Sequence, residues 1–349
     1  MKTLIHIIPT LENGGAETVL SRLVEEFSAK GIEQFVFTSQ GTITDFHYAA
    51  INKYATILDW KTNPESVEQI ILQNRKAPII AWMYPAIFLV HKLKFRLKTE
   101  HPVFWNIRHS SFRWNQIYQK LALFAFSVYS YLKQPKIIYC SNRAKEVHEM
   151  YFFSKKNSVV IHNRLAKKQN SVSLEVNAPD EKSEPFFLYV GRYDPIKGPK
   201  RLVQITRTFF LENPRINLKI AGSGWTVDKI PKQIRDRVFL LGNVKNIYPL
   251  YQSAKALLFT SHAEGYPNVL VEAVVSGTPI VGFEAGDSKL ILDNYRFGYS
   301  INTPNEFIDK LGFVLENPVS EEEKKKEIIR QQKLLDFKTT AQDYLSFLE

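Results

Sequence analysis

The chain has one cysteine among 349 residues and no long uncharged run. Cys140 alone excludes an intramolecular disulfide framework or a multi-cysteine zinc site, and it favours a reducing compartment, with the cytoplasm as the default. The longest uncharged stretch, residues 77–90, has 14 residues and an internal proline. Because a helix needs about 20 apolar residues to span a bilayer, no transmembrane helix is predicted. The start MKTLIHIIPTLENGG predicts a first strand, since Pro9, Glu12 and Asn13 interrupt the apolar core that a signal peptide would have.

Acidic residues are scarce in the first half of the chain. Residues 1–165 contain 21 Lys and Arg against 12 Asp and Glu, a net charge of +9, whereas residues 166–349 contain 25 against 23, a net charge of +2. A basic half suits an anionic partner, either the cytoplasmic membrane surface or a nucleic acid. A basic surface that serves only solubility is the alternative.

Short apolar runs alternate with helical patterns along the whole chain, which predicts an α/β fold with parallel sheets. The length suits two domains, which we expect at residues 1–165 and 186–349, joined by a polar linker at 166–185. Ligands of such sheets bind at the carboxyl ends of the strands, and a crevice between two halves is a natural site. The predicted strands are TLIHIIPT, QFVFTS, PIIAWM, PVFWNIRH, KIIYCS, SVVIHN, FFLYVG, NLKIAG, VFLLG, ALLFTS and PIVGF.

Two loops after strands of the second half carry residues suited to a phosphate. In YVGRYDPIKGPKRLVQ, Arg192 and Lys197 lie between a strand and a helix, where an Arg fork, a Lys charge and backbone amides can hold a diphosphate. Solvated surface cations are the alternative. In KIAGSGW, Gly222 ends another strand, and it serves either a ligand or only a tight turn.

The segment AEGYPNVLVEA, residues 263–273, predicts a helix that begins near Pro267, because proline fits the first helical position. Glu264 then lies in the loop before the helix and Glu272 lies inside it. Carboxylates only accept hydrogen bonds, so the two glutamates suit two sets of sugar hydroxyls. The alternative is that a glutamate near a helix start only opposes the helix dipole.

These segments together resemble a known family. VGRYDPIKG, IAGSG, LLGNVKNIYPLYQSAKALLFTSHAEGYPNVLVEAVVSGTPIVG and, near the N-terminus, ENGGAETVLSRL occur in the order and spacing of retaining family 4 glycosyltransferases with the GT-B fold. The Glu-x7-Glu pair at 264 and 272 is the hallmark of that group. The resemblance implies two Rossmann-like domains that face each other across a cleft. It places the acceptor in the N-terminal domain, the nucleotide sugar in the C-terminal domain, and the last helix back on the N-terminal domain.

The resemblance also implies roles for residues of the second half. Glu264 and the amides of the following residues hold donor-sugar hydroxyls, and Glu272 holds the ribose. Arg192 and Lys197 neutralise the departing diphosphate. The segment with Gly242 and Val244 reads the base, for which uracil is expected. Gly222 completes the donor-binding set, and the amides after Glu264 belong to Gly265, Tyr266, Pro267 and Asn268.

In the first half, the resemblance adds Gly14 and Gly15, whose amides approach the sugar or phosphate, and His109, which lies over the donor sugar. A ligand-free helix entry and a structural histidine are the respective alternatives. No metal or other cofactor is implied, and the chain contains no Asp-x-Asp, the arrangement with which metal-dependent sugar transferases hold a divalent ion.

A basic segment and an aromatic segment predict contact with an anionic membrane, and with it a peripheral place at the inner face of the cytoplasmic membrane. The aromatic segment, residues 114–133, is equally explained by a buried helix. Residues 88–98 alternate apolar side chains with the cations Lys92, Lys94, Arg96 and Lys98.

The function expected from these observations is transfer of a hexose or N-acetylhexosamine, with retention, from a UDP-sugar to a glycan, lipid-linked, in cell-surface polysaccharide assembly. A UDP-sugar 2-epimerase is the alternative, although no set of acid and base carboxylates stands out for it. A nucleic-acid-binding protein lacks a recognisable binding motif and is not expected, and a nicotinamide dehydrogenase lacks the full G-x-G-x-x-G fingerprint.

Overall fold

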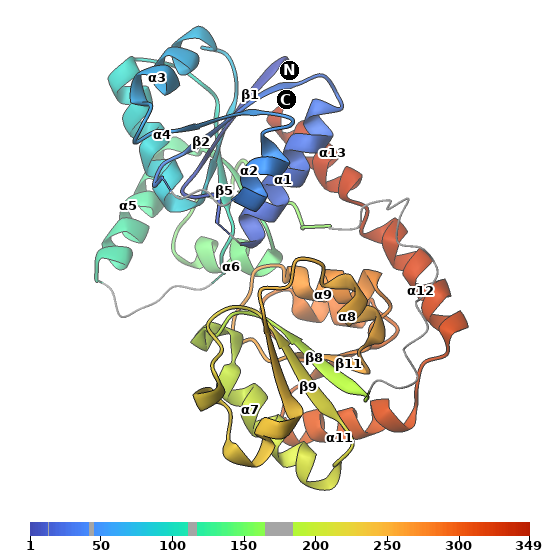
Figure 1. Cartoon of the computed structure of the whole chain (residues 1–349). Helices are drawn as coiled ribbons and strands as arrows, with labels where there is room; N and C mark the ends of the chain where they lie inside the picture. Colours follow the sequence, from blue (N-terminus) through green and yellow to red (C-terminus); the bar gives the residue numbers. More distant parts are fainter. Residues whose placement is uncertain (13, 42–44, 111–116, 165–183) are drawn as a thin grey trace. The chain divides into compact units, whose positions relative to one another are not determined.

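The computed structural model describes residues 1–12, 14–41, 45–110, 117–164 and 184–349. The chain forms two compact units (Figure 1). Unit 1 consists of Met1–Asn163 together with Phe337–Glu349, and unit 2 is Arg164–Asp336. Most of the predicted linker, residues 166–183, lies outside the described residues. In the ranges described, no helix is both long and apolar enough to cross a membrane.

Unit 1 is a parallel seven-stranded sheet in the order β3-β2-β1-β4-β5-β6-β7. The strands are β1 Thr3–Ile8, β2 Glu33–Thr38, β3 Thr56–Asp59, β4 Ile79–Trp82, β5 Val103–Ile107, β6 Lys136–Tyr139 and β7 Ser158–Val160. The helices are α1 Gly15–Ser28, α2 Asp45–Ile51, α3 Pro64–Gln73, α4 Met83–Leu97, α5 Ile117–Lys133, α6 Asn142–Met150 and α13 Phe337–Leu348.

The core of unit 1 follows from strands that are covered on both faces. All four residues of β4 are buried, and so are the last five of β1, which is why these strands are nearly continuous apolar runs in the sequence. Helix α1 repeats apolar residues with helical periodicity, and its Val19, Leu23 and Phe27 are fully buried.

The C-terminal helix α13 is bonded to the carboxyl side of the unit 1 sheet. The buried Tyr344 hydroxyl accepts from Asn106 Nδ2 at 2.9 Å and from Arg108 at 3.3 Å. Thr340 Oγ1 donates to the carbonyl oxygen of His162 at 2.9 Å. These bonds lie beside the two points, after residues 163 and 336, where the chain passes between the units.

Unit 2 is a parallel six-stranded sheet in the order β10-β9-β8-β11-β12-β13. The strands are β8 Phe186–Val190, β9 Asn217–Ala221, β10 Val238–Gly242, β11 Ala256–Phe259, β12 Ile280–Phe283 and β13 Gly298–Ile301. The α-helices are α7 Pro199–Glu212, α8 Tyr248–Ser253, α9 Asn268–Val275, α10 Ser288–Asp293, α11 Pro304–Glu316 and α12 Glu321–Leu334. Short 3-10 helices are η1 Pro195–Lys197, η2 Val227–Lys229 and η3 Lys232–Arg237.

All eleven predicted strands are present, and the structure adds β3 and β13. Both added strands are four residues long and lie at a sheet edge, and most of their residues are only partly buried, so they lack an apolar run in the sequence. The highly charged helix α12 is solvated on one face only, because Ile328 and Gln331 are buried and Ile328 packs at Gly277 beside α9.

Candidate functional site

The strand order of unit 2 reverses between β8 and β11, and parallel sheets bind ligands at the carboxyl ends of strands at such a point. The loop after β8 carries Arg192 and Lys197, and the loop after β11 carries Ser261 and Glu264. Residues that are about 70 positions apart in the sequence therefore meet at the place where the topology favours a ligand.

Lys197 and Glu264 form an ion pair across this reversal point. Lys197 Nζ lies 2.6 Å from Glu264 Oε1, which also accepts from Ser261 Oγ at 2.8 Å. The carbonyl oxygen of Lys197 accepts from the Tyr189 hydroxyl at 3.2 Å and from Thr260 Oγ1 at 3.1 Å. Hydrogen bonds thus fix both the ammonium group and the backbone carbonyl of Lys197. The side chains of Lys197 and Glu264 are only 26% and 13% exposed, so little water reaches their ion pair. Ser261, Tyr189 and Thr260 were not singled out in the sequence, although Ser261 follows a strand directly.

The turn that presents Lys197 requires a glycine next to it. Gly198 has φ +69, and a Cβ there would lie 1.9 Å from the carbonyl oxygen of Thr260. We expect Gly198→Ala to lower the free energy of unfolding by about 2 kcal/mol or more, measured by urea denaturation. Gly312→Ala is the matched control, since Gly312 lies in α11 with nothing within 4 Å of an added Cβ. That change should stabilise by about 0.5–1 kcal/mol, and equal effects of both substitutions would contradict the prediction.

Arg192 is an exposed cation that already has an acidic neighbour. Its Nε and Nη2 lie 3.2 and 3.1 Å from Asp194 Oδ2, while Asp194 Oδ1 accepts from the amide of Ile196 at the start of η1. Any anion at Arg192 would therefore share the guanidinium with Asp194. This partner was not recognised in the sequence, although it lies only two residues away.

The glycines that follow β8 and β9 and the glycine that ends β10 lie against one another. A Cβ on Gly222 would lie 2.2 Å from the carbonyl oxygen of Gly191 and 2.9 Å from the amide nitrogen of Arg192. The Gly222 amide donates to the carbonyl oxygen of Gly242 at 2.7 Å, and the half-buried Val244 follows two residues later. The structure therefore joins Gly222 and Gly242 and places both next to the loop of Arg192.

Helix α9 begins at Asn268, and Pro267 is its N-cap residue with extended backbone at ψ 109. The predicted helix start near Pro267 is therefore confirmed, with Pro267 as the cap and Asn268 as the first helical residue. Glu272 lies inside α9, where its Oε2 accepts from the buried Tyr251 hydroxyl at 3.1 Å. Burial and the nearby Glu272 raise the pKa of Tyr251, which keeps this phenol a hydrogen-bond donor.

The loop before α9 is fixed by the backbone. The Asp287 amide donates to the carbonyl oxygen of Gly265 at 3.0 Å, and the residue that follows Gly265, Tyr266, is buried. Burial raises the pKa of the Tyr266 phenol. The predicted donor residues 264–268 thus form an ordered turn, and Glu264 and Glu272 have different side-chain partners.

The predicted residues of unit 1 lie at the carboxyl side of its own sheet. Gly14 is the N-cap of α1, Gly15 is the first residue of that helix, and the carboxylate of Glu17 lies so close that a Cβ on Gly14 would be 2.4 Å from it. An acidic group therefore already lies against this helix start. His109 follows β5, and it is described below with its neighbours.

His109 belongs to a cluster of aromatic rings from four elements. Its ring centroid lies 5.2 Å from that of Tyr84 and 5.4 Å from that of His148, both in edge-on geometry, and Tyr84 stacks on Phe126 at 4.9 Å. The hydroxyls of Tyr84 and Tyr139 are buried, and neither has a hydrogen-bond partner among the residues that the structure describes. Tyr84 and His148 were missed in the sequence because they come from α4 and α6.

The histidines of unit 1 should make its stability depend on pH. Burial lowers the pKa of His6, His91 and His109 to about 4 and that of His148 to about 3, from 6.5. Below pH 6.5 these histidines become protonated in the unfolded chain but stay neutral in the native state. The free energy of unfolding is therefore highest above pH 6.5 and falls as the pH drops towards 4. Each histidine contributes a slope of up to about 1.4 kcal/mol per pH unit.

Urea denaturation between pH 5 and 7 measures this slope. His109→Gln should lower it by roughly the share of one histidine. A free energy of unfolding that is constant over this range would contradict the assignment of neutral, buried histidines.

The four predicted basic residues of α4 differ in their surroundings. Lys94 Nζ donates to the carbonyl oxygen of His101 at 2.6 Å. Arg96 forms an ion pair with Glu68 and lies 5.3 Å from the ring centre of Trp60. Lys92 and Lys98 are exposed. Lys94 and Arg96 thus have partners within unit 1, and the membrane contact of all four residues stays a prediction.

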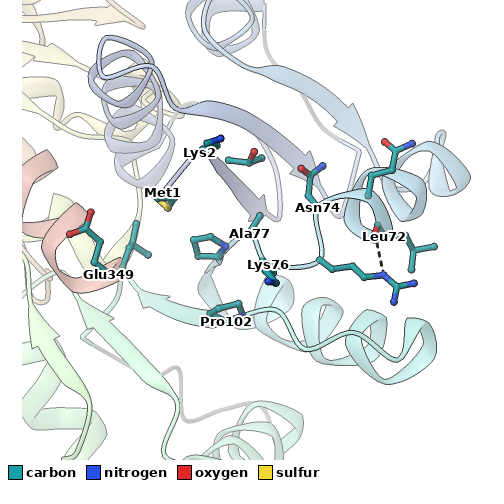
Figure 2. A pocket seen from close by; sticks show the side chains of 13 residues that line it. Met1, Lys2, Leu72, Asn74, Lys76, Ala77, Pro102 and Glu349 are labelled. Carbon is teal, nitrogen blue, oxygen red and sulfur yellow. Dashed lines mark hydrogen bonds between the residues drawn. The ribbon is translucent and has the colours of Figure 1, made fainter.

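A cavity of about 690 Å³ lies at the opposite, amino edge of the unit 1 sheet (Figure 2). Lys2, Asn74, Lys76 and Glu349 are among the side chains around it. No predicted site residue lines this cavity. Within the ranges that the structure describes, no three His, Cys, Asp or Glu side chains form a group that could hold a metal ion.

Residues 174–334 match the family described as "Glycosyl transferases group 1". This segment, somewhat less than half of the chain, is therefore similar to a group 1 glycosyl transferase domain. The matched residues include Lys197 and the loops after β8 and β11. They also include both glutamates of the predicted Glu-x7-Glu pattern, Glu264 and Glu272.

Two curated relatives of the group 1 domain are bacterial. A poly(ribitol-phosphate) alpha-N-acetylglucosaminyltransferase of Staphylococcus aureus is 29% identical over 153 residues, 41% of this chain and 31% of that protein. A poly(glycerol-phosphate) alpha-glucosyltransferase of Bacillus subtilis is 33% identical over 147 residues, 39% of this chain and 21% of that protein. The matched part of this chain thus spans less than a third of either relative.

Solved structures match over the whole chain. HepE of Anabaena in complex with UDP has a TM-score of 0.78 at 16% identity and covers 100% of this chain and 99% of its own. TarM has a TM-score of 0.76 at 14% identity with the same coverage. The fold is therefore GT-B, with parallel α/β sheets in both units, as predicted.

Proposed function

We propose that this chain is a retaining family 4 glycosyltransferase that moves a hexose or N-acetylhexosamine from a UDP-sugar to a glycan acceptor. The observation that carries the proposal is the Lys197–Glu264 pair at the strand-order reversal of a group 1 domain. A cation suited to a diphosphate and an acceptor suited to sugar hydroxyls meet there. A nucleotide sugar carries a diphosphate and sugar hydroxyls next to each other in one molecule.

The proposed roles follow from the surroundings of each side chain. Lys197 and Arg192 stabilise the charge that develops on the departing diphosphate, and Glu264 accepts from hydroxyls of the donor sugar. Glu272, oriented by Tyr251, accepts from the ribose hydroxyls. Glu264 and Asp194 neutralise the positive charges of Lys197 and Arg192 in the absence of a ligand. When the nucleotide binds, its diphosphate neutralises part of these positive charges instead.

The remaining donor contacts come from backbone groups. The amides of Gly265 to Asn268 approach the sugar, and the segment with Gly242 and Val244 contacts the base, for which uracil is proposed. In unit 1, Gly14, Gly15 and His109 are proposed to contact the donor from their own sheet edge. A neutral His109 acts as a hydrogen-bonding group and not as a cation, since burial lowers its pKa to about 4.

The chemical step proposed is front-face displacement. The acceptor hydroxyl attacks the anomeric carbon from the side that UDP leaves, the bond between that carbon and the diphosphate oxygen breaks, and the leaving phosphate takes the hydroxyl proton. The protein contributes position and charge stabilisation. The reaction is proposed to need no metal, because Lys197 and Arg192 supply the positive charge.

The acceptor is proposed to be a lipid-linked glycan of surface-polysaccharide assembly, used at the inner face of the cytoplasmic membrane. The relatives named above act on poly(ribitol-phosphate) and poly(glycerol-phosphate). The basic first half of the chain suits an anionic glycolipid or the membrane that carries it.

The test combines the protein with UDP-glucose, UDP-galactose, UDP-N-acetylglucosamine or UDP-N-acetylgalactosamine and a lipid extract of bacterial membranes, with and without EDTA. We expect UDP release that depends on the extract and survives EDTA, and an α-linked product by NMR. An inverted anomeric centre would overturn the retaining assignment. Conversion of a UDP-sugar into its 2-epimer without any extract would favour an isomerase instead.

A further inference from the structure

Helix α5 turns an apolar face to solvent. Phe124 is 67% exposed, Tyr131 70% and Leu132 68%, and Leu121 and Val128 are exposed on the same stripe with helical spacing. The opposite face is packed, since Ser127 and Ser130 are buried. Leu123 is buried with these two serines, while most of the other large apolar side chains of α5 are exposed, so the alternative of a fully buried helix is wrong for residues 117–133.

Helix α4 lies beside α5 and extends this surface. The Tyr129 hydroxyl lies 3.2 Å from His91 Nδ1, which joins the two helices in unit 1 (Figure 1). On α4, Phe88 is 65% exposed and Phe95 is 89% exposed. We call the seven exposed side chains the α4–α5 face: Phe88, Phe95, Leu121, Phe124, Val128, Tyr131 and Leu132.

The chain around this face is strongly basic. Residues 69–145 contain 13 Lys and Arg and a single acidic residue, Glu100, a net charge of 13 − 1 = +12. Lys92 lies on α4 between Phe88 and Phe95, and Lys133 ends α5, and both are exposed. Exposed cations therefore lie within and at the end of the apolar stripe.

We propose that the α4–α5 face inserts into the surface of an anionic lipid bilayer. Its aromatic and leucine side chains enter the boundary between headgroups and acyl chains, and Lys92, Lys98 and Lys133 bind lipid phosphates. The large apolar area calls for an apolar partner. In a dimer through this face, two strongly basic surfaces would repel each other. An anionic lipid bilayer instead offers acyl chains to the apolar side chains and phosphates to the lysines.

The membrane contact of the α4–α5 face would bring the enzyme to a lipid-linked acceptor, and only this role rests on the proposed function. It differs from the sequence prediction in the residues that carry the contact. The apolar stripe of α5 and the exposed lysines are the binding groups, and Lys94 and Arg96 are not.

Flotation of the purified protein with vesicles tests the proposal. Vesicles contain either phosphatidylcholine alone or phosphatidylcholine with 30% phosphatidylglycerol. Phe124→Ser/Leu132→Ser removes apolar contacts, and Lys92→Glu/Lys133→Glu reverses charge. Leu211→Ser/Ile329→Ser is the matched control, because these two side chains of unit 2 are 79% and 59% exposed but lie outside the face. UDP binding by calorimetry checks each variant separately.

We expect wild type and the control to bind the anionic vesicles, and both α4–α5 variants to bind at least tenfold more weakly. Each lost cation costs about fivefold, and each large apolar side chain that no longer leaves water costs about tenfold. All variants should bind UDP alike. Unchanged vesicle binding by the α4–α5 variants would overturn the inference. The inference would also be overturned if the wild type did not bind vesicles but formed a dimer, and if Phe124→Ser/Leu132→Ser dissociated that dimer. Vesicle binding without UDP binding would overturn the proposed function alone.

Discussion

Lys197→Ala is expected to lower kcat/KM for sugar transfer by about a thousandfold, because it removes the cation proposed to stabilise the leaving diphosphate in a sparsely solvated site. Lys197 Nζ is held against Glu264 at 2.6 Å, and its carbonyl oxygen is bonded to Tyr189 and Thr260. A side chain held in this way is positioned before the donor arrives, so its loss acts on the chemical step. Steady-state kinetics with a radiolabelled UDP-sugar measures the change.

Lys200→Ala is the matched control for this prediction. Lys200 lies three residues away on α7 and is exposed, so its removal changes the net charge equally without touching the Glu264 pair. We expect it to keep wild-type kcat/KM. Similar losses in both variants would assign the effect to general charge and contradict a specific role of Lys197.

Glu264→Gln is expected to reduce kcat by about a hundredfold or more while UDP binds nearly as in wild type, because the carboxylate is proposed to hold the sugar and not the nucleotide. Glutamine keeps the size and one acceptor oxygen but loses the charge. It also leaves Lys197 without its acidic partner, which distinguishes Glu264 from a solvated carboxylate. Kinetics and calorimetry on the same protein separate the two effects.

Glu284→Gln provides the comparison. Glu284 also forms an ion pair, with Lys289, but its side chain is 42% exposed and that of Glu264 is 13% exposed. Its replacement should leave transfer unchanged. The double variant Lys197→Ala/Glu264→Gln should lose less than the product of the two single effects, since the residues act on one donor. Strict additivity would mean that they work independently.

The sheets could be predicted because their strands are buried on both faces. Segments such as TLIHIIPT and ALLFTS are apolar throughout and end at polar or glycine residues, and each forms a strand. The segment LLGNV with Gly242 and the segment AEGYPNVLVEA likewise lie at strand or helix ends, as their residues indicated. The carboxyl edge of the unit 2 sheet follows from this pattern.

Side-chain pairs between distant loops could not be predicted, because they depend on strand order. The sequence places Lys197 and Glu264 on different loops, and only the reversal between β8 and β11 brings them together. The same holds for Tyr84 and His148 around His109. For residues 117–133, periodicity alone did not say which face of the helix is buried, and the buried face carries Leu123, Ser127 and Ser130.

Unit 2 is proposed to bind a nucleoside diphosphate at the pair of Lys197 and Glu264. Isothermal titration calorimetry with UDP, GDP and ADP, each with EDTA, tests it most directly on wild type, Lys197→Ala and Lys200→Ala. We expect UDP to bind most tightly, EDTA to have no effect, and only Lys197→Ala to weaken binding. UDP binding that is equal in all three proteins, or absent from wild type, would contradict it.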